Sequence, residues 1–78
     1  MTREEILKVL TDQKNGEGNR KLLAFCREPK TFDGMGKAGV KGDLFRVLVD
    51  LKNAEGIVFA DGKYFATPLA LEVLKSLQ

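Results

Sequence analysis

The chain offers few side chains that could perform catalysis or bind a metal. It holds one cysteine and no histidine, and histidine is both the usual general base near neutral pH and the commonest metal ligand. Cys26 follows Leu22, Leu23 and Phe25, so we interpret it as a core residue rather than a nucleophile or half of a zinc pair. A single cysteine cannot form an internal disulfide, which is typical of a reducing compartment. The sequence therefore predicts that the protein is not an enzyme and binds no metal or cofactor.

Residues 34–39, Gly-Met-Gly-Lys-Ala-Gly, match the Gly-x-Gly-x-x-Gly fingerprint of dinucleotide-binding sites. That fingerprint functions when a strand precedes it and an acidic residue ends the next strand. Residues 27–33, which precede it here, do not have the pattern of a buried strand, and a chain of 78 residues cannot supply the surrounding sheet. We therefore interpret the match as coincidental.

Basic side chains are the other group with chemical meaning, because lysine and arginine bind phosphates. The whole net charge of +2 comes from residues 27–52, where six positive and four negative side chains occur. This placement favours a phosphate-facing surface over that segment, whereas the alternative is an ordinary solvated helix face with the same small bias.

A helix followed by a hairpin is expected to position these basic residues. In residues 41–55, apolar side chains recur at the spacing of one helical face, and Gly56 is expected to end the helix in a left-handed conformation. Residues 57–60 and 63–66 are rich in β-branched and aromatic side chains. They flank Asp61-Gly62, a pair that favours a type I′ hairpin turn.

The run from Gly39 to Val58, continued by residues 61–64 and by Thr67-Pro68-Leu69, resembles the winged helix-turn-helix family. The likeness is strongest to the small repressors that respond to antibiotics or metals. It implies a helix that lies in the DNA major groove and a hairpin, the wing, that touches the phosphate backbone. Winged helices also bind proteins, so the fold and the function are separate expectations.

Two helices are expected ahead of this region. Thr2 and Glu5 have the form of a capping box, in which each side chain accepts from the other residue's backbone amide, and the first helix starts there. Residues 14–19 contain two glycines and two asparagines, which is typical of a loop. Asn19 is the expected N-cap of a second helix, and Pro29 ends that helix.

Residues 31–39 are expected to form the first helix of the helix-turn-helix. Thr31 is the expected N-cap, Phe32 and Met35 are expected to face the core, and Gly39 is expected to lie in the turn. Glycine costs roughly 1 kcal/mol at an interior helical position relative to alanine. Two further glycines lie inside this segment, so the sequence predicts a short or distorted helix.

A last helix is expected after the hairpin. Thr67 is its expected N-cap, Pro68 suits its first turn, and its apolar residues form one stripe of Ala70, Val73, Leu74 and Leu77. Both terminal helices are short, whereas the repressors that the chain resembles dimerise through longer ones. We therefore expect a monomer or a weak dimer.

The resemblance implies six DNA-contacting residues. Side chains of the recognition helix would lie on the major groove, where arginine suits guanine and asparagine suits adenine. Lysines before the helix would contact phosphates, as would one lysine at the wing. The first group is Lys41, Arg46 and Asn53, and the second is Lys30, Lys37 and Lys63. The predicted partner is double-stranded DNA, and the predicted function is that of a small DNA-binding protein, as in transcriptional regulation.

A rival expectation is a protein-interaction module that binds no DNA. Asp43 and Asp50 share the polar side of the expected recognition helix and would repel phosphates. The same helix, or the surface of Phe59 and Phe65, would then dock a protein. Strand alternation places Tyr64 and Phe65 on opposite faces, and the sequence leaves open which of the two is exposed.

Length and composition predict one domain, residues 1–78. The resemblance and the order of the expected elements imply the fold class α+β: a winged helix with a three-helix core, a two-stranded wing and a C-terminal helix. The hydrophobic fraction of 44% and the charged fraction of 31% are typical of a folded globular chain. No apolar run approaches the roughly 20 residues that cross a bilayer, and the first residues lack the basic-then-apolar order of a signal peptide. The sequence therefore predicts a cytoplasmic protein without a membrane partner.

Overall fold

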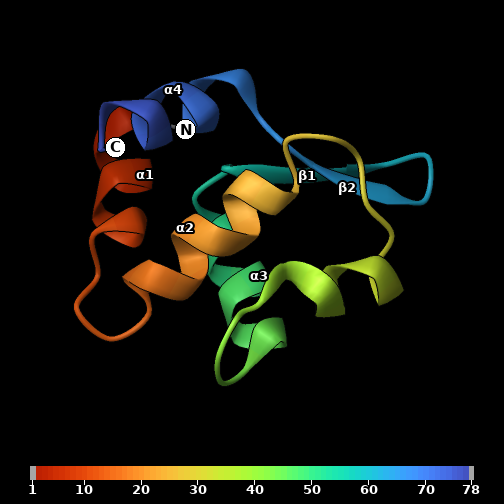
Figure 1. Ribbon diagram of the computed structural model, residues 1–78. Coiled ribbons are helices and arrows are strands. Elements are labelled where there is room, and N and C mark those ends of the chain that lie inside the picture. Colours follow the sequence, from red (N-terminus) through yellow and green to blue (C-terminus); the bar gives the residue numbers. More distant parts are fainter. Residues whose placement is uncertain (1, 78) are drawn as a thin grey trace.

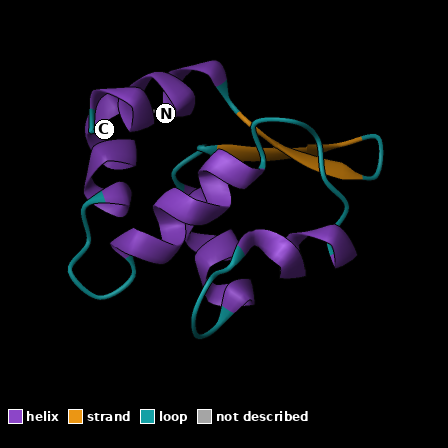
Figure 2. Ribbon diagram, viewed as in Figure 1, coloured by secondary structure: helices purple, strands orange, loops and turns teal. Residues whose placement is uncertain are grey.

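The computed structural model describes residues 2–77 as an α+β fold of four α-helices, one short 3₁₀ helix and one antiparallel hairpin (Figure 1). Residues 1 and 78, which the single-domain prediction includes, lie outside the described residues. Helix α1 packs on α4, and the hairpin turn lies at the other side of the molecule (Figure 2). The elements in chain order are α1 (Arg3–Leu10), α2 (Gly16–Phe25), η1 (Asp33–Ala38), α3 (Leu44–Asn53), β1 (Ile57–Ala60), β2 (Lys63–Ala66) and α4 (Pro68–Ser76).

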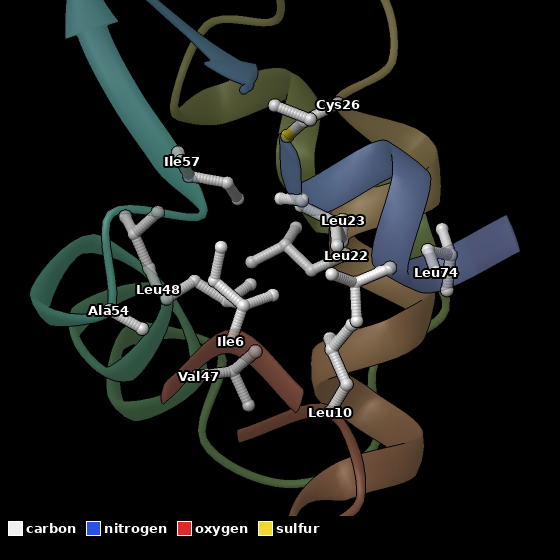
Figure 3. Packing of buried hydrophobic residues seen from close by; sticks show 14 of the residues in the cluster. Ile6, Leu10, Leu22, Leu23, Cys26, Val47, Leu48, Ala54, Ile57 and Leu74 are labelled. Atoms are coloured by element: carbon white, nitrogen blue, oxygen red, sulfur yellow. The ribbon is translucent and has the colours of Figure 1, made fainter. Parts of the chain in front are cut away.

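Each element contributes at least one buried apolar residue to one core. On α3 these residues are Val47, Leu48 and Leu51, which recur at helical spacing, so the predicted apolar face of this helix is confirmed. Side chains from α1, α2, α3 and β1 point toward one another in Figure 3. The largest fully buried side chains include Ile6, Leu10, Leu22, Leu23, Met35, Leu51, Ile57 and Leu74.

Local side-chain caps begin three of the helices. At α1, the Glu5 amide donates to the Thr2 hydroxyl oxygen at 3.1 Å, which confirms one half of the predicted capping box. In the other half, the Glu5 carboxylate accepts from the Thr2 hydroxyl, whereas the prediction has it accept from the Thr2 amide. At α4, Thr67 accepts from the Ala70 amide, and Pro68 occupies the first turn, as predicted. Helix α3 starts at Leu44 rather than Lys41, because Asp43 accepts from the Arg46 amide at 3.2 Å and acts as its N-cap.

The predicted hairpin is confirmed. Ile57 pairs with Ala66 and Phe59 pairs with Tyr64, so both pairs share the core-facing side of the ribbon. Asp61 and Gly62 have φ values of 54° and 76°, the positive angles that a type I′ turn requires at both central positions.

The prediction that Gly56 is the left-handed residue at the end of α3 is wrong. Glu55 has φ of 59°, and Gly56 is absent from the positive-φ residues among those described. The Gly56 amide donates to the Leu51 carbonyl and the Glu55 amide to the Lys52 carbonyl, which is a Schellman motif with Glu55 at the left-handed position. The helix ends at Asn53, two residues before the predicted Glu55. The Thr67 amide donates to the Gly56 carbonyl at 2.9 Å, which holds Gly56 beside the start of α4.

The prediction that Asn19 caps α2 is also wrong, since α2 begins at Gly16 and Asn19 lies inside it. The Asn19 Nδ2 donates to the Val9 carbonyl at 2.7 Å, and Arg20 donates to the Leu10 carbonyl. These two side chains therefore satisfy carbonyls at the end of α1. A Cβ at Gly16 would lie only 2.9 Å from the Leu10 carbonyl oxygen, so a glycine there lets α2 approach α1 closely.

Residues 31–39 form the short, distorted helix that their glycines predict, as the 3₁₀ helix η1. Thr31 accepts from the Gly34 amide at 3.2 Å, and Gly39 takes the left-handed conformation of a turn. Met35 is fully buried, as predicted. The prediction that Phe32 faces the core is wrong, because this side chain is 46% exposed. Phe32 is the residue that precedes η1, whereas Met35 lies within it, so Phe32 is not part of the helical face that packs on the core.

Candidate nucleic-acid interface

The outer face of α3 lies opposite its buried stripe. Phe45 is 62% exposed, Asn53 is exposed, and the Arg46 side chain is 68% exposed. The Arg46 Nε lies 3.6 Å from the Asp50 Oδ1, one helical turn away. An exposed ion pair of this kind contributes little to stability, so the guanidinium can exchange this partner for another acceptor.

The chain before α3 brings a basic cluster to the start of that helix. Lys41, Lys14 and Lys21 line a hollow of about 100 Å³ together with Glu17, which lies 3.2 Å from the Lys21 ammonium. The sequence predicted Lys41 as a DNA-contacting residue and missed Lys14 and Lys21. No local pattern marks these two lysines, because they join Lys41 only when α2 packs on α3.

A second basic cluster lies where α3 ends and the hairpin begins. The Lys30 amide donates to the Tyr64 carbonyl at 2.8 Å, and the Tyr64 amide donates back to the Lys30 carbonyl at 2.7 Å. The Lys30 ammonium lies 5.2 Å from the centre of the Phe25 ring, and the Lys52 ammonium lies 5.8 Å from that of the Tyr64 ring. The sequence predicted Lys30 and missed Lys52, which stands in the last turn of α3.

The two faces of the hairpin differ in what they present. Phe59 and Tyr64 share the core-facing side, with ring centres 4.6 Å apart and ring planes 49° apart. Phe59 is nevertheless 53% exposed, because the ribbon extends past the edge of the core. The sequence left open which of Tyr64 and Phe65 is exposed. The two side chains lie on opposite faces of the hairpin, and both are half-buried.

The opposite flank of α3 is more acidic. A depression of about 420 Å³ between α1 and α3 is lined by Glu5, Asp12 and Asp50, and also by the predicted DNA-contacting residues Arg46 and Asn53. These carboxylates oppose phosphate binding on the α1 side of the helix. The buried Asn19 also lines this depression, and its Oδ1 has no hydrogen-bond partner within residues 2–77.

Lys37 and Lys63 are the two predicted DNA-contacting lysines that are not members of either cluster. Lys37 is exposed in the last turn of η1, and Lys63 is exposed beside the hairpin turn. Asp43, which the sequence suggests would repel phosphates, caps α3 with its carboxylate. The positive end of the helix dipole partly offsets that negative charge.

Cys26 has the surroundings of a core residue. It is fully buried, and its Sγ lies 3.6 Å from the Met35 Sδ. Burial raises the pKa of the Cys26 thiol to about 11, and the Lys30 charge opposes that rise. Such a thiol is protonated and unreactive at neutral pH. Among the described residues, no three cysteine, histidine or acidic side chains gather to hold a metal ion.

Comparison of the chain with protein-family models found no match. Comparison with curated proteins and with solved structures likewise found none. Over residues 2–77, no helix has the length and apolar character to cross a membrane. The surface formed by α3, its two basic clusters and the hairpin is therefore the basis for the functional inference.

Proposed function

We propose that the protein is a winged-helix module that binds double-stranded DNA. The order of α2, the Lys30 bridge, η1, α3 and the hairpin supports this proposal, because it is the order of elements expected of a winged helix. The isolated antiparallel bridge between Lys30 and Tyr64 attaches the chain before η1 to the edge of the hairpin.

The observation that carries the proposal is the placement of basic side chains at both ends of α3. Lys14, Lys21 and Lys41 lie near its start, and Lys30 and Lys52 lie near its end. A helix of ten residues is about 15 Å long, and the major groove is about 12 Å wide. Lysines at the two ends would therefore meet phosphates on both sides of the groove.

The outer face of α3 carries side chains suited to base edges. Arg46 presents a planar fork for guanine, and Asn53 can accept from and donate to adenine. Both are exposed; Arg46 lies between the two basic clusters along the helix, and Asn53 follows Lys52 as the last residue of α3. Phosphate contacts would set the position of the helix, and these two side chains would read sequence.

Salt-dependent binding to mixed-sequence duplex DNA tests the proposal. Lys41→Ala should weaken binding to all sequences alike and reduce the slope of log K against log salt by about one unit. Lys75→Ala makes the same charge change in the last turn of α4, outside α3 and its two basic clusters, and should leave the slope unchanged. Absence of duplex binding by the unaltered protein at low salt would remove the proposal, because the electrostatic attraction is strongest there.

A separate variant tests whether Arg46 recognises bases. Arg46→Lys keeps the charge but loses the bidentate fork. It should keep the salt slope of the unaltered protein and lose about 1 to 3 kcal/mol of discrimination between selected and mixed sequences. Equal loss of affinity for every sequence would instead place Arg46 on phosphate.

A protein-interaction module is the second candidate, and the exposure of Phe45 favours it. This ring is 62% exposed on the outer face of α3, where exposed aromatic residues are typical of protein interfaces. If duplex binding is absent and Phe45→Ser abolishes binding to an isolated protein partner while the melting temperature is kept, this candidate replaces the first.

The predicted monomer or weak dimer remains a prediction. Helix α1 has 8 residues and α4 has 9, so neither offers a long dimerisation surface. Analytical ultracentrifugation at micromolar concentration should show mostly monomer. A tight dimer would reassign the partly exposed Leu77 to an interface.

A further inference from the structure

We infer that the hairpin carries a stacking site for one unpaired nucleic-acid base, formed by Phe59 and the adjacent Tyr64 ring, with Lys52 over Tyr64 and Lys30 opposite Tyr64 in the bridge. The inference rests on the proposed function and extends it. The protein would bind a duplex with a single-stranded extension more tightly than the same duplex with a blunt end.

The first observation is the exposure of Phe59 on a side of the hairpin that is otherwise apolar and packed. Ile57 lies two residues earlier on the same face and is 1% exposed, whereas Phe59 is 53% exposed. The Tyr64 ring supports Phe59 at 4.6 Å between ring centres. Phe59 is therefore held by a neighbouring ring while much of its own surface remains open.

The second observation is the charge around this pair of rings. Lys30 is directly opposite Tyr64 in an antiparallel bridge, so the two side chains leave the ribbon on the same side. The Lys52 ammonium lies over the Tyr64 ring from α3. The nearest acidic partner of Lys30 is the exposed Glu28, at 3.9 Å from its ammonium. An open aromatic ring beside lysines is the arrangement by which proteins bind single strands, since rings stack on bases and cations meet the backbone.

The paired bases of a duplex cannot stack fully on the Phe59 ring. Bases inside a duplex are already stacked on both sides, so an aromatic side chain gains most from a base that is unpaired. The charge around Phe59 also favours a polyanion over an apolar protein segment. We therefore assign an unpaired nucleotide next to the duplex as the occupant.

The test uses fluorescently labelled DNA hairpins, which have one free end each. One has a blunt end, one has a three-nucleotide extension, and one has an extension of three abasic units that keeps the phosphates but lacks the bases. The unaltered protein should bind the base-bearing extension about 5- to 150-fold more tightly than the blunt hairpin. The abasic extension should give little of that gain.

Two variants at one position and one matched control complete the design. Phe59→Ala and Phe59→Leu should both remove the gain, because neither side chain has an aromatic face, and the leucine variant keeps much of the apolar volume. Phe32→Ala removes another exposed phenylalanine, from the residue preceding η1, and should keep the gain. Thermal melts confirm that each variant is folded.

Three outcomes would overturn the stacking site: no gain from the extension, an equal gain from the abasic extension, or a gain that survives in both Phe59 variants. Binding to the blunt hairpin would still support the proposed function in each case. Conversely, binding to a separate single strand that depends on Phe59, without duplex binding, would support the stacking site and remove the duplex function.

Discussion

The hairpin and the η1 segment both contain glycine, yet glycine has opposite effects in them. In the hairpin, Gly62 has φ of 76°, an angle that the turn requires. In η1, Gly36 is absent from the positive-φ residues among those described, and a Cβ there would meet nothing within 4 Å. Gly62 therefore permits the hairpin turn, whereas Gly36 only lowers the stability of a helix.

The two segments also differ in how the core holds them. The hairpin buries Ile57 and Ala66 at its base and pairs its strands over their whole length. Helix η1 buries Met35 alone among its residues and packs on α2. Local turn chemistry and tertiary packing act together in the hairpin, whereas η1 depends chiefly on packing.

The largest expected effect is on the base of the hairpin. Ile57→Ala should lower the free energy of unfolding by about 2 to 5 kcal/mol, because the side chain is fully buried and its removal leaves a cavity. Phe59→Ala, on the same face but half exposed, should cost about 1 kcal/mol or less. Urea unfolding of both variants checks this, and equal losses would contradict the view that the core ends before Phe59.

The turn should show the next largest effect. Gly62→Ala forces an alanine into a left-handed conformation, which should cost about 1 to 2 kcal/mol. Thermal unfolding measures the loss, and cross-strand proton contacts between residues 59 and 64 report whether the hairpin persists. Unchanged stability would mean that the turn does not need its glycine.

The matched substitution in η1 should have the opposite sign. Gly36→Ala should raise stability by about 0.4 to 1 kcal/mol, because alanine restricts the unfolded chain and fits the open space beside it. The same unfolding measurement applies. A loss as large as that of Gly62→Ala would show that η1 needs its glycine and would end the contrast between the two segments.

The last prediction changes no residue and concerns the reactivity of the Cys26 thiol, which packs against Met35 of η1. With the pKa of Cys26 near 11 rather than its ordinary 9.0, the thiolate fraction at pH 8 is about 100-fold lower than in the unfolded chain. Alkylation should therefore be slow, and its rate should keep rising with pH beyond 9 toward 11. Fast labelling at pH 8 would indicate that Met35 leaves its place over Cys26 readily.

Most of the helical and strand elements could be predicted from the sequence because their determinants are close neighbours. Thr2, Asp61-Gly62 and Thr67 act on amides and backbone angles within a few residues. The errors have non-local causes. Asn19 donates to a carbonyl of α1, and Gly56 accepts from the Thr67 amide. Asn19 therefore does not act as a helix N-cap, and Gly56 is not the left-handed residue at a helix end.

The candidate site also has one part that could be predicted from the sequence and one part that could not. By itself, the sequence determined that basic residues gather before and within α3, that Arg46 and Asn53 share its outer face, and that a hairpin follows. Only the tertiary structure decided which lysines meet. Packing of α2 on α3 places Lys14 and Lys21 beside Lys41, and backbone pairing with Tyr64 places Lys30 near Lys52. Such contacts join residues far apart in the chain, and helical or strand periodicity relates only near neighbours.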